Sequence, residues 1–214
     1  MNAVRIRVMM LAITSLTSGA VMSPTQSVLP GSGLIAHVEG KVYLNEQSVE
    51  PSNTPNYILN PNSVVRTEAG RAEIRFAGGV FLFLGENTAV KRIPSGSYNF
   101  SRFEVLNGST IVITGEKGSH AICENEVTLS DFGLFRFDVF RLPEPIVPKV
   151  CGFKVNRGAA AVKLSSVIAV ATPGKFLSLG GGAGDRVALQ KFDIEQKDEL
   201  DNWASQRISL LPIQ

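Results

Sequence analysis

The residues that could do chemistry in this 214-residue chain are few and widely spaced. Two cysteines, Cys123 and Cys151, and two histidines, His37 and His120, are the candidates for nucleophilic catalysis. A thiol nucleophile needs a base beside it, and neither histidine stands in a recognisable Cys-His motif. The Asp and Glu residues are dispersed, without the paired acids or the nucleophile–base set that a hydrolase needs. We therefore predict that the protein is not an enzyme and that it has no catalytic, cofactor-binding or metal-binding residues.

The two cysteines have a structural interpretation. In an oxidising compartment, Cys123 and Cys151 most simply form a disulfide. Such a bond would close a loop of about 29 residues and would stabilise the fold by roughly 3–4 kcal/mol in the chain-entropy model. The alternative is a pair of buried free thiols.

A glycine-rich run, Gly180–Gly184 followed by Asp185, is similar to two kinds of ligand-binding motif. It lacks the Gly-Lys-Ser/Thr ending of a phosphate-binding loop. It is also one residue short of the calcium-binding nonapeptide spacing and occurs once, whereas those repeats work as arrays. We favour a flexible exit from the last β-strand.

The N-terminus has the pattern of a secretion signal. Arg5 and Arg7 precede the apolar stretch Val8–Ile13, and small residues that include Ala20 follow. This order predicts a signal peptide over residues 1–20, cleaved after Ala20. A retained anchor is the alternative, although the run is shorter than the roughly 20 apolar residues of a membrane span. We expect a periplasmic or secreted protein with no stable membrane span after cleavage.

The composition favours an all-β fold. The chain has 20 glycines, 11 prolines and 12 phenylalanines, which fits many short strands joined by turns. A hydrophobic content of 44% is enough to fill a core. A formal net charge of +2 gives no reason to expect nucleic acid as a partner.

The stretch 61–92 carries the clearest strand pattern. Apolar residues that include Ile74 and Phe76 alternate with charged residues, which is the period-2 signature of a half-buried strand. Gly78–Gly79 then predicts a hairpin turn, because glycine takes the positive φ that such a turn needs. Another turn is predicted at residues 67–70. The predicted core residues are Ile74, Phe76 and either Leu82 or Leu84.

A pattern of strand, tight turn and strand occurs twice in the second half of the chain. Four residues of the first copy recur with the same spacing in the second: Phe103, Val105, Gly108 and Val112, then Phe153, Val155, Gly158 and Val162. We interpret each copy as a hairpin and predict stacked short hairpins, in a β-solenoid or sandwich-like arrangement. The alternative is chance, because any two hairpins look alike and a solenoid normally needs about three repeats.

The order of turns and strands resembles the FecR-like domain, which is found in the extracytoplasmic parts of cell-surface signalling proteins. The matching residues are Asn62–Val64, Thr67, Gly70–Ala72, Ile74, Phe76, Gly79, Phe81, Leu84 and Thr88, preceded by an opening strand at Gly33–Gly40 and Val42. Two turns depart from the family, since Ala77–Gly79 replaces Asp-Gly-Ser and Gly85–Asn87 replaces Pro-x-Ser. The resemblance covers residues 33–115. It implies a FecR-like β domain over 31–115, followed by a continuing β segment over 116–190.

The resemblance also implies a function. We expect a non-enzymatic extracytoplasmic binding or signalling module that acts by protein–protein contacts with an envelope or periplasmic protein. The usual members carry an anti-sigma segment and a membrane helix before this domain, whereas seven residues precede the apolar stretch here. We therefore expect a stand-alone secreted type. The alternative is a carbohydrate- or cell-envelope-polymer-binding β module, although one Trp and three Tyr are a thin supply for sugar stacking.

A short helix is predicted in the C-terminal segment 191–214. Acidic residues come early in it, which suits the positive N-terminal end of a helix dipole. The pattern Asp201-x-Trp203-x-x-x-Arg207 resembles the ending of a subset of secreted FecR-like proteins. Trp203 and Arg207 are interaction candidates, because Trp and Arg are common anchors of interfaces. The alternative, which we favour, is that Trp203 covers the open end of the β stack.

Overall fold

The computed structural model describes residues 32–54, 56–94, 101–115, 120–123, 125–129, 132–140, 150–164, 167–179 and 189–211. The predicted signal peptide and the glycine-rich run at 180–184 lie outside these residues. The described residues form the following elements: β1 Gly33–Leu44, β2 Gln47–Ser48, a 3-10 turn Pro51–Asn53, β3 Ile58–Leu59, β4 Val64–Phe76, β5 Val80–Leu84, β6 Ala89–Ile93, β7 Arg102–Thr114, β8 His120–Cys123, β9 Asn125–Leu129, β10 Gly133–Phe140, β11 Val150–Arg157, β12 Ala160–Leu164, β13 Val167–Ala171, β14 Lys175–Leu179, β15 Leu189–Lys191 and α1 Glu199–Ser209.

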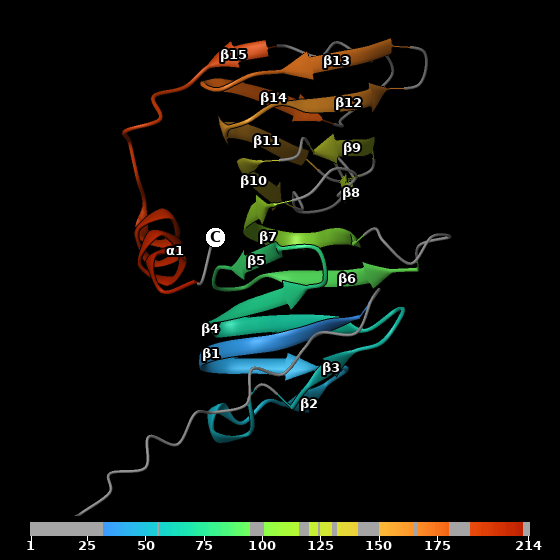
Figure 1. Ribbon diagram of the computed structural model, residues 1–214, viewed down its shortest axis with the longest axis vertical. Helices are drawn as coiled ribbons and strands as arrows, with labels where there is room; N and C mark the ends of the chain where they lie inside the picture. Colours follow the sequence, from blue (N-terminus) through green and yellow to red (C-terminus); the bar gives the residue numbers. More distant parts are fainter. Residues whose placement is uncertain are drawn as a thin grey trace, which may run out of the picture.

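The strands stack in layers along the long axis of the molecule, and α1 lies along one side of the stack (Figure 1). Strand β7 connects two branches of the sheet. Its first half pairs with β6 and β8, and its second half pairs with β5 and β10. Strand β4 is divided between β6 and β5 in the same way. We call β5, β10, β11, β14 and β15 the helix-side branch, and β6, β8, β9, β12 and β13 the opposite branch.

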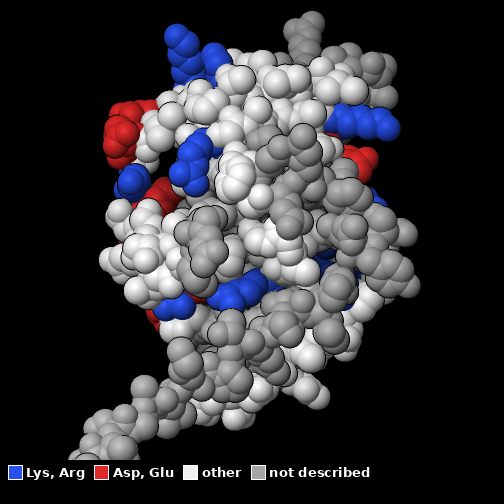
Figure 2. All heavy atoms as spheres, in the orientation of Figure 1, with Lys and Arg blue, Asp and Glu red and all other residues white. Residues whose placement is uncertain are grey.

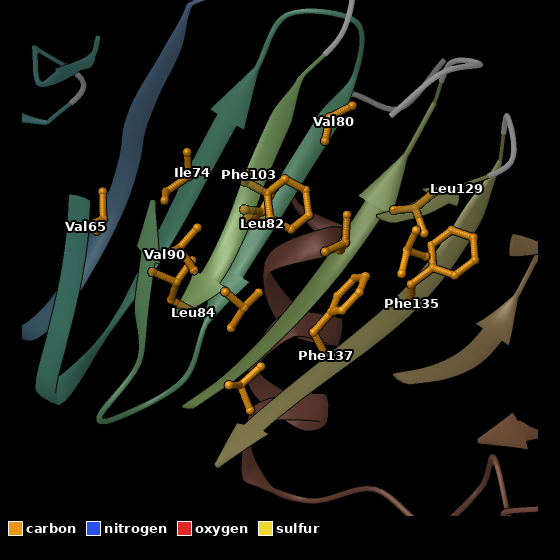
Figure 3. Close-up of a cluster of buried hydrophobic side chains, with 14 of the residues drawn as sticks. Val65, Ile74, Val80, Leu82, Leu84, Val90, Phe103, Leu129, Phe135 and Phe137 are labelled. Carbon is orange, nitrogen blue, oxygen red and sulfur yellow. The ribbon is translucent and has the colours of Figure 1, made fainter. Parts of the chain in front are cut away.

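The main hydrophobic core lies between the two branches. Phe103, in the first half of β7, meets Phe137 of β10 edge to face, with ring centroids 6.1 Å apart. The Phe137 ring lies 4.8 Å from that of Phe153 in β11. Figure 3 shows Phe103 and Phe137 in this cluster, together with Ile74 of β4 and Leu82 of β5. Ile74 and Phe76, which were predicted for the core, are buried, and so are both Leu82 and Leu84, of which one was expected there.

Glycines allow the long strands to bend from one branch into the other. Gly108, in the middle of β7, has a φ of +85°, and a Cβ there would collide with the backbone of Thr88. Gly40 of β1 has a φ of +65° and lies opposite Gly70 of β4, so that a Cβ at either position would collide with the other strand. These bends need glycine, because other residues rarely adopt such φ values and would not fit the close approach.

The structure confirms the predicted all-β fold with a short C-terminal helix. The hairpin predicted at Gly78–Gly79 also forms, with positive φ at both glycines. Residues 67–70 do not form a turn but lie within β4. Gly108 and Gly158 do not close hairpins but lie at corners, where the chain passes from one branch of the sheet into the other. The strands that flank Gly158, β11 and β12, belong to different branches and pair with other strands.

The two β segments predicted over 31–115 and 116–190 contribute to a single sheet. Strand β7 ends the first segment, and it pairs with β8 and β10 of the second. Helix α1 lies within the predicted C-terminal segment. In the described ranges, no helix is both long and apolar enough to cross a membrane.

Candidate functional site: the helix-covered face of the sheet

Helix α1 begins with a reciprocal cap. Oδ1 of Asp198 accepts the backbone N–H of Asp201 at 3.0 Å, and Oδ2 of Asp201 accepts the N–H of Asp198 at 3.1 Å. This capping box satisfies two of the N–H groups that would otherwise be unpaired at the helix start. Arg207 lies in the last turn, where the helix dipole favours a cation. The sequence therefore defines both ends of the helix locally.

The outer face of the helix-side branch is apolar where α1 covers it. Phe83 of β5 and Ile111 of β7 point away from the main core, because successive residues of a strand face opposite sides. The rings of Phe83 and Trp203 meet edge to face, with centroids 6.0 Å apart and planes at 82°. Trp203 is only 5% exposed. The buried residues of this second cluster are Phe83, Ile111, Ile113, Leu200, Trp203 and Ala204.

The indole of Trp203 also has a polar partner. Its Nε1 donates to Oε1 of Glu39 in β1 at 2.9 Å, and Nε2 of His37 lies 3.1 Å from the same oxygen. Burial raises the pKa of Glu39, but the hydrogen bonds from Trp203 and His37 outweigh burial, so the pKa lies below its ordinary value. The guanidinium of Arg71 lies 6.0 Å from the Trp203 ring centroid, within the range of a cation–π contact.

A buried carboxylate holds the C-terminal end of α1. Glu73 lies on the outer face of β4, and its side chain is 1% exposed. Its Oε2 accepts a hydrogen bond from Nε of Arg207 at 2.9 Å and lies 2.8 Å from Nη2. A carboxylate removed from water needs such a partner, because its desolvation is costly without one.

Arg136 of β10 ties the N-terminal end of α1 to the sheet. Its Nε contacts Asp138 at 2.8 Å, its Nη2 contacts Asp198 at 2.7 Å, and its Nη1 contacts Asp201 at 2.9 Å. Burial lowers the pKa of Arg136, but the hydrogen bond to Asp198 and the charges of Asp138 and Asp201 outweigh burial and raise the pKa. Each of the three guanidinium nitrogens thus has its own carboxylate.

The pKa values of the two capping carboxyls shift in opposite directions. For Asp198, burial raises the pKa, but the hydrogen bonds from Arg136 and from the backbone of Asp201 outweigh burial and lower it. For Asp201, burial is the largest cause and raises the pKa. The charge of Asp198 adds to this rise, while the backbone hydrogen bond from Asp198 and the charge of Arg136 only partly offset it.

We call these ion pairs, together with the apolar cluster under α1, the helix clamp. Acidic and basic side chains lie close together on the side of the molecule where α1 lies (Figure 2). Asp198 and Asp201 cap the N-terminal end of α1 and form ion pairs with Arg136, and this arrangement holds the helix against the sheet. Among the residues that the structure describes, no three His, Cys, Asp or Glu residues are grouped to hold a metal ion.

A small pocket lies beside the clamp, between α1, the segment 192–197, β10 and β11. Its volume is about 160 Å³, and its wall includes apolar Leu134 and Phe192 and polar Lys154 and Gln196. Typical sites for drug-sized molecules have volumes of roughly 300–1,000 Å³, so this pocket could accept only a small ligand. Its lining residues include neither Cys nor His.

The two interaction candidates from the sequence, Trp203 and Arg207, both contact the chain's own sheet. Trp203 covers the outer face of the helix-side branch, rather than the end of the stack. Sequence reasoning misses their partners Glu39 and Glu73, and it also misses Arg136. The alternation in β4 does place Glu73 on an outer face, but no local signal shows that a distant helix covers that face.

The structure gives partial information on the predicted disulfide. Cys151 of β11 is fully buried and disulfide-bonded, and Cys123 is the only other cysteine in the chain. The side chain of Cys123 lies outside the described residues. The bond between Cys123 and Cys151 therefore stays a prediction.

Comparison with known proteins gives a likeness of fold. No family model and no curated protein match this chain. Two crystal structures of a proposed anti-sigma factor from Parabacteroides distasonis ATCC 8503 do match it, each with a TM-score of 0.51 and with 12% and 10% sequence identity. The matched part is 62% of this chain and 61% of each neighbour, so the chain spans less than two thirds of those proteins. At these identities, the likeness establishes that the chain shares a fold with these proteins.

Proposed function

We propose that this chain is a non-enzymatic, extracytoplasmic signalling module of the FecR-like type, which acts by protein–protein contacts. Two likenesses support the proposal: the strand and turn pattern of residues 33–115, and the fold shared with a proposed anti-sigma factor. The partner is a protein of the periplasm or the cell envelope.

The observation that carries the proposal is how the chain uses its partly buried charges. The groups with the largest pKa shifts are Arg136 and Asp198, which form an ion pair at the start of α1, and Arg136 also binds Asp201 there. An enzyme uses shifted groups at a cleft that substrate can enter. Here Arg136 and Asp201 do line the small pocket beside α1, but Arg136 forms ion pairs with Asp198 and Asp201. We infer that these pairs hold the helix against the sheet and so shape a surface. Surfaces of fixed shape suit protein recognition.

The burial of Trp203 distinguishes this proposal from the alternative of a polymer-binding module. Sugar-binding sites use exposed aromatic rings for stacking, and the chain has one Trp. Its ring is buried between α1 and the sheet, where a polysaccharide would not reach it. We therefore favour a protein partner.

Affinity capture with a competition arm tests the proposed function. Tagged protein is incubated with envelope extract from the organism that encodes it, with and without an excess of untagged protein. We expect a protein whose capture the untagged protein abolishes, and whose purified form binds saturably in calorimetry. Saturable co-sedimentation with envelope polysaccharide, with no competed protein, would instead support the polymer-binding alternative.

The proposed compartment has its own test. We expect the mature protein to begin at Val21, because small residues end the predicted signal peptide at Ala20. N-terminal sequencing of protein from the soluble periplasmic or secreted fraction measures this directly. Intact Met1 on membrane-bound protein would contradict the soluble extracytoplasmic assignment.

A further inference from the structure

The edges of the described sheet differ in how well they are protected from further pairing. At one end of the stack lie β2 and β3, and at the other lie β13 and β15 (Figure 1). Strands β2 and β3 have two residues each, and β15 has three and carries Lys191. Short strands and edge lysines are the usual protection against unwanted strand pairing. Those three edges are therefore poor templates for another strand.

Strand β13 has none of this protection. Its sequence, Val-Ile-Ala-Val-Ala, contains no charge, no proline and no glycine, and among the described strands it pairs with β12 alone. Ile168 is 67% exposed and Val170 is 62% exposed. A five-residue apolar edge with β-branched side chains is a favourable site for adding a strand.

We propose that β13 pairs antiparallel with β13 of a second copy of this chain, about a two-fold axis at Ala169. The sequence of β13 suits this pairing, because Ile168 and Val170 are placed symmetrically about Ala169. With Ala169 opposite Ala169 of the second copy, Ile168 lies opposite Val170 of that copy, and Val170 lies opposite its Ile168. Two cross-strand pairs of β-branched residues then cover each other on one face. The contact is the same on both copies, as a two-fold dimer requires.

The charges near β13 permit this contact. The nearest described charge on the neighbouring strand is Lys163 of β12, which lies opposite Ile168. In the proposed dimer, the two Lys163 residues are separated by three strand spacings, or about 14 Å. This distance exceeds the Debye length of about 8 Å at physiological salt. Repulsion between the two copies is therefore small.

The test uses the purified protein alone and measures self-association by sedimentation equilibrium over a range of concentrations. We expect a dimer in the wild type. The variant Ile168→Lys/Val170→Lys places like charges opposite one another in both pairs and should weaken association roughly tenfold or more. The variant Ile168→Glu/Val170→Lys places opposite charges in both pairs and should associate more tightly than the two-lysine variant. This difference is specific to the proposed register.

Leu189→Lys, on exposed β15, is the matched control and should leave the dimer unchanged. Ile168 and Val170 are largely exposed, so all variants should keep the thermal melt of the folded monomer. A wild type that stays monomeric, or two double variants that associate equally, would overturn the proposal. The β13 surface is separate from the helix clamp, and the purified protein alone reports on it. The result is therefore independent of the proposed signalling function.

Discussion

The carboxylate of Glu73 and the guanidinium of Arg207 form an ion pair across 134 residues of sequence, with Oε2 2.9 Å from Nε and 2.8 Å from Nη2. The side chain of Glu73 is 1% exposed, whereas that of Arg207 is 22% exposed. The sheet thus contributes a buried charge, and the helix contributes its counter-charge. Each side chain depends on the other for its place in the fold.

Removing Arg207 should destabilise the protein strongly. Arg207→Ala leaves the carboxylate of Glu73 buried without its partner, and we expect a loss of about 2–4 kcal/mol in the free energy of unfolding. Urea unfolding, followed by circular dichroism, measures this loss. The double variant Glu73→Leu/Arg207→Leu removes both charges and should recover most of the loss, because an apolar pair of similar volume carries no desolvation cost.

An arginine with exposed partners provides the matched control. Arg66 of β4 is half-buried, but the side chains of its partners Glu46 and Glu68 are exposed, so Arg66→Ala leaves no buried carboxylate unpaired and should change stability little. Equal effects of Arg66→Ala and Arg207→Ala would contradict the conclusion that burial of Glu73 makes the clamp important.

Trp203 should be the main apolar anchor of α1. Trp203→Ala removes a nearly fully buried ring and should cost roughly 3–5 kcal/mol. Trp203→Phe keeps most of the ring contact with Phe83 but loses the hydrogen bond to Glu39, which should cost about 1 kcal/mol for the hydrogen bond in addition to the lost volume. Thermal melts compare the two variants.

The fluorescence of Trp203, the only Trp in the chain, reports the same anchor independently. We expect blue-shifted emission in the folded protein and a shift to the red in Phe83→Ala, which removes its ring partner. Water-like emission from the folded wild type, with an unchanged melt for Trp203→Ala, would show instead that the ring is exposed and free to bind a partner.

The strand pattern of the sequence was enough to predict the core of β4. Ile74 and Phe76 are buried because strict alternation places them on one face of a strand, and this rule is local. Strand β5 is apolar at every position, so the sequence left open whether Leu82 or Leu84 faces the core, and both are buried. The corners are different. A glycine with positive φ can close a hairpin or turn a strand into another branch, and the residues around Gly108 do not distinguish these outcomes. Only the pairing of distant strands decides between them.

The candidate site was less predictable for the same reason. Trp203 and Arg207 stood out by residue type, and their helix could be predicted from composition and charge. Their partners Glu39 and Glu73 look like ordinary surface acids of strands near the start of the chain. Because burial of Glu73 comes from a helix more than 120 residues away, no window of sequence contains the necessary information.

Acidification should weaken the N-terminal end of the clamp through Asp198. Its pKa is lower in the folded protein than in the unfolded chain, so it stabilises the fold above the unfolded value of about 3.9 and loses that contribution as the pH falls below it. Asp201 affects stability in the opposite direction. Because its pKa is raised in the folded protein, its ionisation lowers the free energy of unfolding, and this destabilisation disappears as the pH falls toward about 3.9.

Urea unfolding across the acid range separates the two groups. In Asp198→Asn, the free energy of unfolding should fall less steeply below about pH 4 than in the wild type. In Asp201→Asn, the free energy of unfolding should fall more steeply with acidification above about pH 4 than in the wild type. The reason is that the variant has lost the protonation of Asp201, which stabilises the folded state in that range. Glu195→Gln, an exposed carboxylate in the segment before α1, is the control and should follow the wild type. Profiles of Asp198→Asn and the wild type that coincide would contradict the role of Arg136 in holding that carboxylate.

The predicted disulfide should join the two branches of the sheet. Cys151 lies in β11 of the helix-side branch, with its side chain in the main core, and Cys123 ends β8 of the opposite branch. A bond between them would restrict the unfolded chain over a loop of about 29 residues, so reduction should cost roughly 3–4 kcal/mol. Mass spectrometry of unreduced digests should find the linked peptides. A reductant should lower the Tm of the wild type but leave that of Cys123→Ala/Cys151→Ala unchanged. Two thiols that react with a labelling reagent in the unfolded, unreduced protein would rule the bond out.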